Sequence, residues 1–164
     1  MRPRTHDGSQ VRIERILNII DQCRFGTHDL SRTELDGVNH LPRFNMPLEL
    51  GLFLGAKRYG QSRHRRKMAL ILDRSPHRYQ KFISDIAGQD IRAHGIDEQR
   101  AISSTSDWLR NSSNRVMPGG NLIGERYRKF KSELPALCRM LELKPEEVTF
   151  NDYNNIVTNW LTRD

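Results

Sequence analysis

Apolar residues recur at helical spacing near the start of the chain and then give way to short continuous runs. Over residues 9–23 they fall three and four positions apart, which predicts an amphipathic helix with Ser9 at its N-cap. Residues 25–30, with the sequence Phe-Gly-Thr-His-Asp-Leu, form a short segment that predicts a strand. Residues 68–73 are apolar up to a final aspartate, which is typical of a strand buried on both faces of a parallel sheet.

Between these two runs, apolar residues cover almost every side of a helix that begins near Asn45. Asn45 stands where an N-cap is expected, and Pro47 suits the first turn, where its missing N–H costs nothing. Glu49 then lies one turn into a helix that we expect to be buried nearly all round. Burial of a carboxylate is costly unless it is paired, hydrogen-bonded or used in chemistry. The apolar residues are Leu48, Leu50, Leu52, Phe53, Leu54 and Ala56.

The alternation of helix, strand, helix and strand predicts an α/β protein with a parallel sheet and right-handed crossovers. Both predicted strands end in an aspartate, Asp29 and Asp73. In open parallel sheets, ligands bind outside the carboxyl ends of the strands. We therefore expect Asp29, Ser31 in the loop that follows it, and Glu49 to converge on one crevice.

The second half of the chain is mainly helical in its pattern, and no linker separates it from the first. One helix is predicted after Pro76 and ends at Gly88, and residues 90–95 form a short third strand or a loop. Pro135 could kink or divide a long helix over residues 122–143. The other predicted helices cover about residues 97–111 and a final segment ending at Trp160 and Leu161.

Composition fits one compact domain, since the chain has 164 residues and 36% of them are hydrophobic. No apolar run approaches the length of a membrane span, and no signal-peptide pattern is present, so we expect a cytoplasmic protein. Cys23 and Cys138 lie in apolar helical contexts and are interpreted as buried thiols. The histidines are scattered without ligand spacing, which predicts no metal site.

The net charge of +7 is concentrated in an eleven-residue segment, 57–67, between the Glu49 helix and the following strand. One interpretation is an anion patch for nucleic acid, nucleotide phosphates or an acidic partner, with nucleic acid bound weakly and without sequence preference. The other is a solvated basic loop, since Tyr59 is the one aromatic residue among the charges. The cations are Lys57, Arg58, Arg63, Arg65, Arg66 and Lys67.

Two motifs within about residues 9–73 resemble a known core. They are Asp-Leu-Ser at the end of the first strand and Asn-x-Pro-x-Glu-Leu-Gly in the helix. The core is shared by nucleoside 2-deoxyribosyltransferases and NAD-cleaving Toll/interleukin-1 receptor (TIR) domains, in which a glutamate opens a buried helix. The chain departs from the transferases at residues 43–46, where they carry an aspartate and a Gly-Thr pair. The whole chain also resembles a family of uncharacterised bacterial proteins, through residues 43–51 and 79–90.

The resemblance implies a flavodoxin-like open parallel sheet of three to four short strands, with a largely helical C-terminal half. It also implies a ligand of the nucleotide type, with NAD or another nucleotide as substrate and no further cofactor. Glu49 would bind the ribose hydroxyls or attack the anomeric carbon, as in N-glycosidases and ribosyl transferases. The residues expected to bind the substrate around Glu49 are Asp29, Ser31, Arg32, Arg43 and Asn45.

Two further classes of function stay open, a non-catalytic nucleotide sensor in bacterial defence or signalling and an adaptor that uses the basic segment. Glu49 itself has a structural alternative, because it could cap its own helix or pair with Arg32 or Arg43.

Folds of this kind open with an apolar strand in the middle of the sheet, whereas residues 1–8 are polar. We therefore expect residues 1–95 to form an α/β core that lacks its first strand, and residues 96–164 to form a helical region packed on it. An open apolar sheet edge would favour pairing with a second copy of the chain, so a homo-oligomer is expected.

Overall fold

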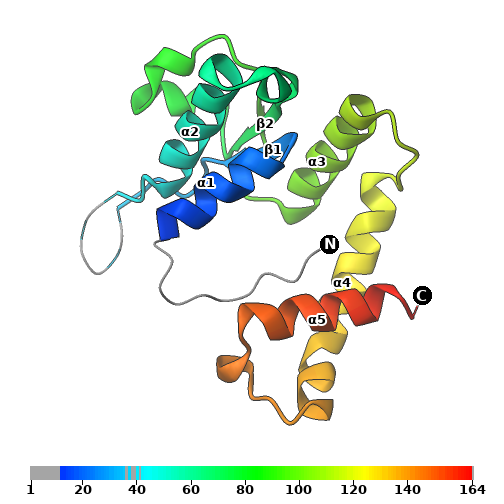
Figure 1. The fold of residues 1–164 in the computed structure, drawn as a ribbon. Helices are drawn as coiled ribbons and strands as arrows, with labels where there is room; N and C mark the ends of the chain where they lie inside the picture. The colour runs from blue at the N-terminus through cyan, green and yellow to red at the C-terminus, as the bar shows by residue number, and fades with distance from the viewer. Residues whose placement is uncertain (1–11, 36, 38–39, 41, 164) are drawn as a thin grey trace.

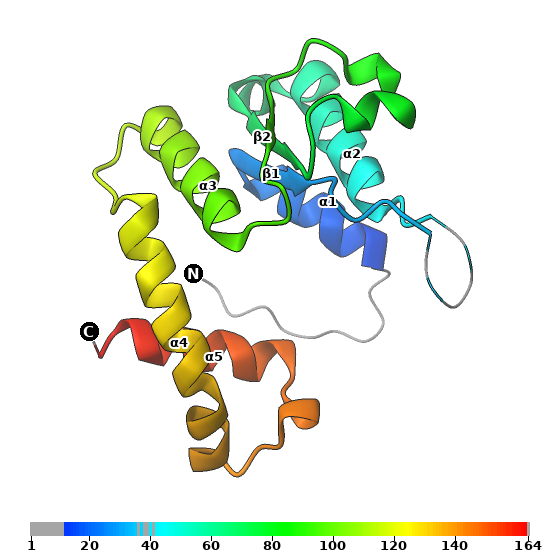
Figure 2. The same ribbon diagram turned by 180° about the vertical axis from the view of Figure 1, so that it is seen from behind.

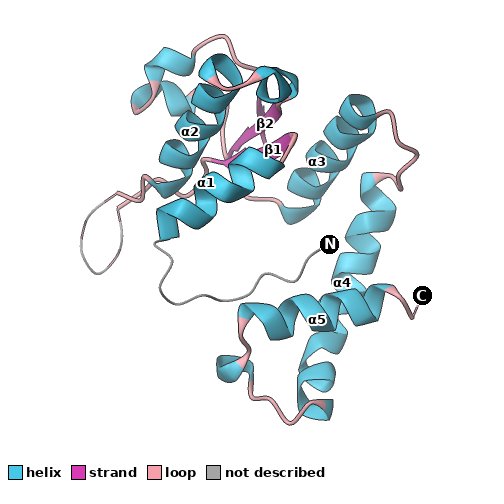
Figure 3. Ribbon diagram, viewed as in Figure 1, coloured by secondary structure: helices cyan, strands magenta, loops and turns pink. Residues whose placement is uncertain are grey.

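The computed structural model describes residues 12–35, 37, 40 and 42–163. A small parallel sheet lies between helices on its two faces, and a helical hairpin extends away from it (Figures 1 and 3). The elements are, in chain order, α1 (Arg12–Gln22), β1 (Phe25–Asp29), α2 (Asn45–Tyr59), β2 (Met68–Asp73), β3 (Ile91–Ala93), α3 (Glu98–Ser113), α4 (Gly120–Met140) and α5 (Phe150–Leu161).

The sheet has the strand order β1-β2-β3, and all its pairs are parallel. Phe25 pairs with Met68 at one end of the first ladder, and Asp29 pairs with Leu72 at the other. This arrangement confirms the predicted α/β fold with an open, flavodoxin-like parallel sheet. Among the described residues β1 and β2 pair directly, and β1 lies at an edge of the sheet.

Side chains on β1 alternate between the two faces of the sheet, as they do in any strand. His28 packs against Phe53 of α2, with ring centroids 5.3 Å apart. Phe25 points the other way and meets Trp108 of α3 edge-on at 5.8 Å. Helices α1 and α2 therefore cover one face, and α3 covers the other (Figure 1). The core of this half consists of Leu30, Leu50, Ile71 and Tyr79.

Helix α2 differs from the prediction in its cap and in its burial. Phe44 is the N-cap and makes no side-chain hydrogen bond, so Asn45 is the first helical residue rather than the cap. Pro47 lies in the first turn, as predicted. Leu50 and Phe53 are buried, but Leu48 is 56% exposed. The expectation that the helix is buried all round was wrong, because only one side of it contacts the sheet and α1.

The segment predicted as one helix after Pro76 forms two short 3₁₀ helices, Arg78–Lys81 and Ser84–Ile86. His77, directly before the first, has a left-handed backbone with φ of 60°, which interrupts regular helical geometry. Tyr79 is still buried in the core, so the apolar stripe was correct although the element was not. The third strand is present as β3.

Helix α4 continues through Pro135 without dividing. It packs against α3 near its start and against α5 further along, and Figure 2 shows it leading away from the sheet. A second core of Phe130, Cys138, Ile156 and Trp160 forms between α4 and α5. Thr149 caps α5 by accepting a hydrogen bond from the Asp152 N–H, while the Asp152 carboxylate accepts one in return.

Both cysteines are free thiols; Cys138 is buried and Cys23 is half-buried. Across the described part of the chain, no helix is both long and apolar enough to cross a membrane.

Candidate functional site

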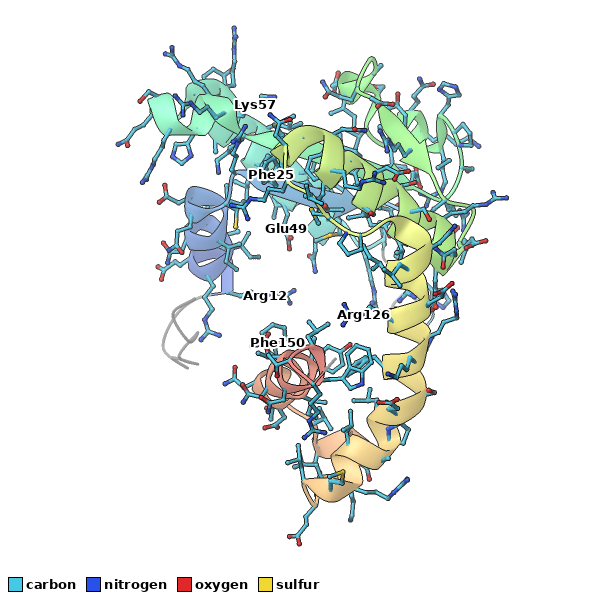
Figure 4. All side chains as sticks on the ribbon, turned by 90° about the vertical axis from the view of Figure 1, so that its right-hand side faces the viewer. Arg12, Phe25, Glu49, Lys57, Arg126 and Phe150 are labelled. Carbon is cyan, nitrogen blue, oxygen red and sulfur yellow. The ribbon has the colours of Figure 1, made fainter. Side chains whose placement is uncertain are left out.

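Glu49 borders two adjoining hollows between α1, α2 and the edge of β1, which we call the Glu49 groove. The first, of about 200 Å³, lies between the starts of the two helices and is lined by Arg12, Ile13, Ile16, Asn45, Leu48 and Glu49. The second, of about 230 Å³, lies along β1 and shares Ile16 and Glu49; its other lining residues are Ile19, Ile20, Cys23, Phe25, Gly26, Thr27, His28 and Phe53. In Figure 4, Glu49 points to the side of the α/β half on which Arg12 lies.

The two hollows of the Glu49 groove offer different groups to a ligand. Arg12 and Asn45 supply a cation and an amide in the first hollow. The second combines isoleucines and Phe53 with the polar side chains of Thr27 and His28. Glu49 stands at the junction, with its side chain half-buried. The groove therefore suits an elongated ligand with an anionic group at the Arg12 end, a group with both apolar surface and polar atoms at the other end, and hydroxyl groups between them.

His28 is a polar group of the second hollow, and sequence analysis missed it as a site residue. Its side chain is buried, and among the described residues its Nε2 atom has no hydrogen-bond partner. Burial lowers the pKa of His28, so the imidazole is neutral at neutral pH. Gly26 makes this packing fit, since a Cβ there would lie 2.9 Å from His28 Nε2 and from a Phe53 ring carbon. Only the alternation along the predicted strand could have indicated this position.

Asp29 points to the opposite face of the sheet from His28, toward α3. Its carboxylate accepts a hydrogen bond from the Ser31 N–H at 2.9 Å and contacts His94 Nε2 at 3.3 Å. The Ile96 N–H donates to His94 Nδ1, so Nε2 carries the proton that faces Asp29. Burial of the Asp29 carboxyl raises its pKa, but the hydrogen bonds from Ser31 and His94 outweigh burial, and the pKa lies below its usual value.

Asp29 and Ser31 do not line either hollow of the Glu49 groove. The structure therefore does not bring Asp29 and Ser31 into the hollows that Glu49 lines. Strand alternation is the reason, because Asp29 shares a face with Phe25 and α3, whereas α2 carries Glu49 on the face of His28.

Asp73 is fully buried at the carboxyl edge of the sheet and ties its loops together. Its Oδ1 accepts from the Arg74 N–H at 2.7 Å and from Arg78 Nη1 at 2.8 Å. The same guanidinium donates to the Leu30 carbonyl at 3.1 Å and to Thr33 Oγ1 at 2.8 Å. This cluster is structural, since Arg78 joins the loops after β1 and β2. The sequence marked Asp73 as a strand end but contained no signal for its partner.

Among the residues expected to bind substrate around Glu49, Asn45 is the one that shares a hollow with it. Arg32 is exposed in the loop after β1, and Arg43 is exposed before α2. Neither of these arginines lines the Glu49 groove.

The basic segment lies at the other end of α2 from Glu49, as Lys57 in Figure 4 illustrates. Arg58 lies in the last turn of α2, while Arg63, Arg65 and Arg66 lie exposed on a 3₁₀ helix, Ser62–Arg66. Arg63 pairs with Asp21 of α1 at 2.5 Å.

Lys67 does not belong to the anion patch, which corrects the prediction. It is buried, and its Nζ donates to the Ile20 and Cys23 carbonyls at the end of α1. Burial lowers the pKa of Lys67. The ammonium therefore caps α1 and fixes it to the start of β2.

Comparison of the chain with protein-family models, curated proteins and solved structures finds no match. Among the described residues, no group of His, Cys, Asp and Glu side chains has an arrangement that could hold a metal ion.

Proposed function

We propose that the chain binds a nucleotide in the Glu49 groove and breaks or transfers its N-glycosidic bond. The observation that carries the proposal is the position of Glu49 between a hollow with a cation and a hollow that combines apolar side chains with His28 and Thr27. Arg12 would bind a phosphate, Asn45 and Glu49 would bind the ribose, and the second hollow would hold the base.

The chemistry follows from the carboxylate. When the bond between the anomeric carbon and the base breaks, the base leaves with the electron pair and positive charge develops on the ribosyl carbon. Glu49 would stabilise that charge, either through space or by forming a bond to the anomeric carbon. Water or a second nucleoside would then supply the oxygen or nitrogen that replaces the base. The proton lost by this acceptor passes to a base that leaves as an anion, or to solvent when the base leaves neutral, as nicotinamide does.

The test is release of a free base from NAD and from a set of nucleosides and nucleotides. Replacing Glu49 by Gln keeps the shape of the side chain and removes its charge, so turnover should fall by roughly three orders of magnitude or more. Ligand affinity should change much less. Glu125→Gln, an exposed position on α4, is the matched control and should leave turnover unchanged.

Equal base release by wild type and Glu49→Gln would remove Glu49 from the mechanism. No base release from any candidate, with a ligand that still raises the melting temperature, would replace the enzyme with a non-catalytic nucleotide sensor.

One observation favours the sensor as the second candidate. Glu49 is the only carboxylate among the described residues that line the two hollows. Most glycosidases use two carboxylates, one to protonate the leaving group and one to stabilise or attack the sugar. A single carboxylate is sufficient for recognition of ribose hydroxyls. Catalysis with one carboxylate requires a base that leaves without protonation, or a proton from another group.

A further inference from the structure

A second groove lies between α4 and α5, far along the chain from Glu49. It has a volume of about 260 Å³ and is lined mainly by aromatic and aliphatic side chains. Tyr127 and Phe130 come from α4, and Tyr153 and Trp160 come from α5. We call this feature the α4–α5 groove. Its remaining lining residues are Pro118, Ile123, Arg126, Val157 and Leu161.

The aromatic rings of the α4–α5 groove are held in fixed orientations. Phe130 meets Trp160 edge-on at 5.3 Å and Tyr153 edge-on at 5.9 Å. Trp160 Nε1 donates to the Glu133 carboxylate at 2.7 Å, which fixes the indole. Tyr153 remains 40% exposed and presents a ring surface at the mouth of the groove.

Cations surround these rings. Arg126 lines the groove itself, and Figure 4 shows it projecting from α4 toward the space between α5 and the α/β half. Lys129 lies 5.7 Å from the Trp160 ring. Lys131 lies 5.5 Å from the Tyr127 ring, and its ammonium pairs with the Glu98 carboxylate at 3.1 Å. Residues 120–131 contain four cations and one carboxylate, Glu125.

We propose that the α4–α5 groove binds single-stranded nucleic acid. Proteins that bind single strands without sequence preference combine aromatic platforms, on which bases stack, with cations that follow the phosphates. In the α4–α5 groove Tyr153 supplies an exposed ring and Arg126 and Lys129 supply cations, and the volume suits one base. Tyr153 would stack on the base, and Arg126 and Lys129 would contact the backbone around it.

The basic segment of residues 57–67 offers the contrasting case. It has charge, but Tyr59 is its one aromatic residue, and that ring is 86% exposed with no described ring packed against it. Both surfaces therefore carry positive charge, and they differ in their capacity to stack a base.

The experiment measures binding of a labelled, mixed-sequence oligonucleotide of about 12 nucleotides by fluorescence anisotropy. Tyr153→Leu should weaken binding by roughly 5- to 100-fold, because one stacked base is lost. Tyr153→Phe keeps the ring and should restore wild-type affinity. Melting temperatures of both variants show that the α4–α5 core is intact.

The cations are tested through salt. Arg126→Gln should weaken binding and lower the slope of log K against log salt by about 0.7, the value for one phosphate contact on a single strand. Arg139→Gln, an exposed cation later on α4, is the matched control and should change affinity much less. The Trp160 emission, measured in a Trp108→Phe background, should change when the oligonucleotide is added.

Three results would overturn the proposal. The first is oligonucleotide binding that is lost in a double Arg65→Gln, Arg66→Gln variant but kept in Tyr153→Leu, because it would transfer binding to the basic segment. The second is tighter binding of duplex than of single strand. The third is no binding of nucleic acid together with binding of an apolar peptide, which would make the groove a protein-docking site.

Discussion

The carboxyl edge of the sheet and the Glu49 groove both carry acidic side chains, but the surroundings of those side chains differ. At the edge, Asp73 is fully buried and receives hydrogen bonds from Arg74 and Arg78. In the groove, Glu49 is half-buried beside open volume. Deep burial with a bound cation indicates a role in holding the loops, whereas a carboxylate beside a hollow remains accessible to a ligand.

The largest effect should come from Arg78. Arg78→Met keeps much of the apolar stem but leaves Asp73 buried without its cation, so the free energy of unfolding should fall by about 3–5 kcal/mol. Glu49→Gln should change it by no more than about 0.5 kcal/mol, as expected for a site outside the core. Denaturant titrations of the two variants and wild type provide the measurement.

A loss of similar size in both variants would end this contrast. Glu49 would then be a structural residue like Asp73, and the nucleotide proposal would lose its support.

The second prediction concerns the two sides of α2. Leu50 is 1% exposed and belongs to the core, whereas Leu48 is 56% exposed and lines the first hollow. Leu50→Ala should lower the free energy of unfolding by about 2–5 kcal/mol, since it opens a cavity. Leu48→Ala, the same substitution two residues earlier, should have an effect within about 0.5 kcal/mol. A larger loss at position 48 than at 50 would contradict the burial of α2 described above.

The smallest effects concern pH and the neighbouring residues His28 and Asp29. Burial lowers the pKa of His28 from 6.5, so the stability that its neutral form supports is complete above pH 6.5 and is lost as the pH falls through the lower folded pKa. The pKa of Asp29 is lowered from 3.8 by its hydrogen bonds, so its contribution is complete above pH 3.8 and is lost below it.

Melting temperatures from pH 8 to about pH 3 separate the two contributions. The difference between wild type and His28→Gln should shrink as the pH falls below about 6.5, and the difference between wild type and Asp29→Asn should shrink only below about 4. The reverse order, with the Asp29 difference shrinking at higher pH than the His28 difference, would contradict the pKa directions given for these two residues.

Sequence patterns were sufficient for the sheet and the main helices, because periodicity and strand-end residues are local properties of the chain. They placed β1, β2 and the start of α2 within a few residues. They did not give the partners of the polar groups. Arg78 reaches Asp73 through a turn with a left-handed residue, His77, and Lys67 reaches carbonyls more than forty positions earlier in the chain.

The predicted shared crevice of Asp29 and Glu49 illustrates the same limit. Both residues were correctly assigned to the ends of their elements. The face of the sheet to which each side chain points depends on strand alternation and on which helix covers which face. Those two properties are set by the whole fold, not by any short segment.

The close packing around Gly26 has a consequence for the sequences that this fold can adopt. The backbone of Gly26 touches both the His28 and the Phe53 side chains so closely that an added Cβ would lie 2.9 Å from each of them. The three positions therefore cannot vary independently. In related chains, a larger residue at position 26 should be accompanied by a smaller one at 28 or 53. A series of substitutions that changes position 28 has to keep these three residues sterically compatible at every step.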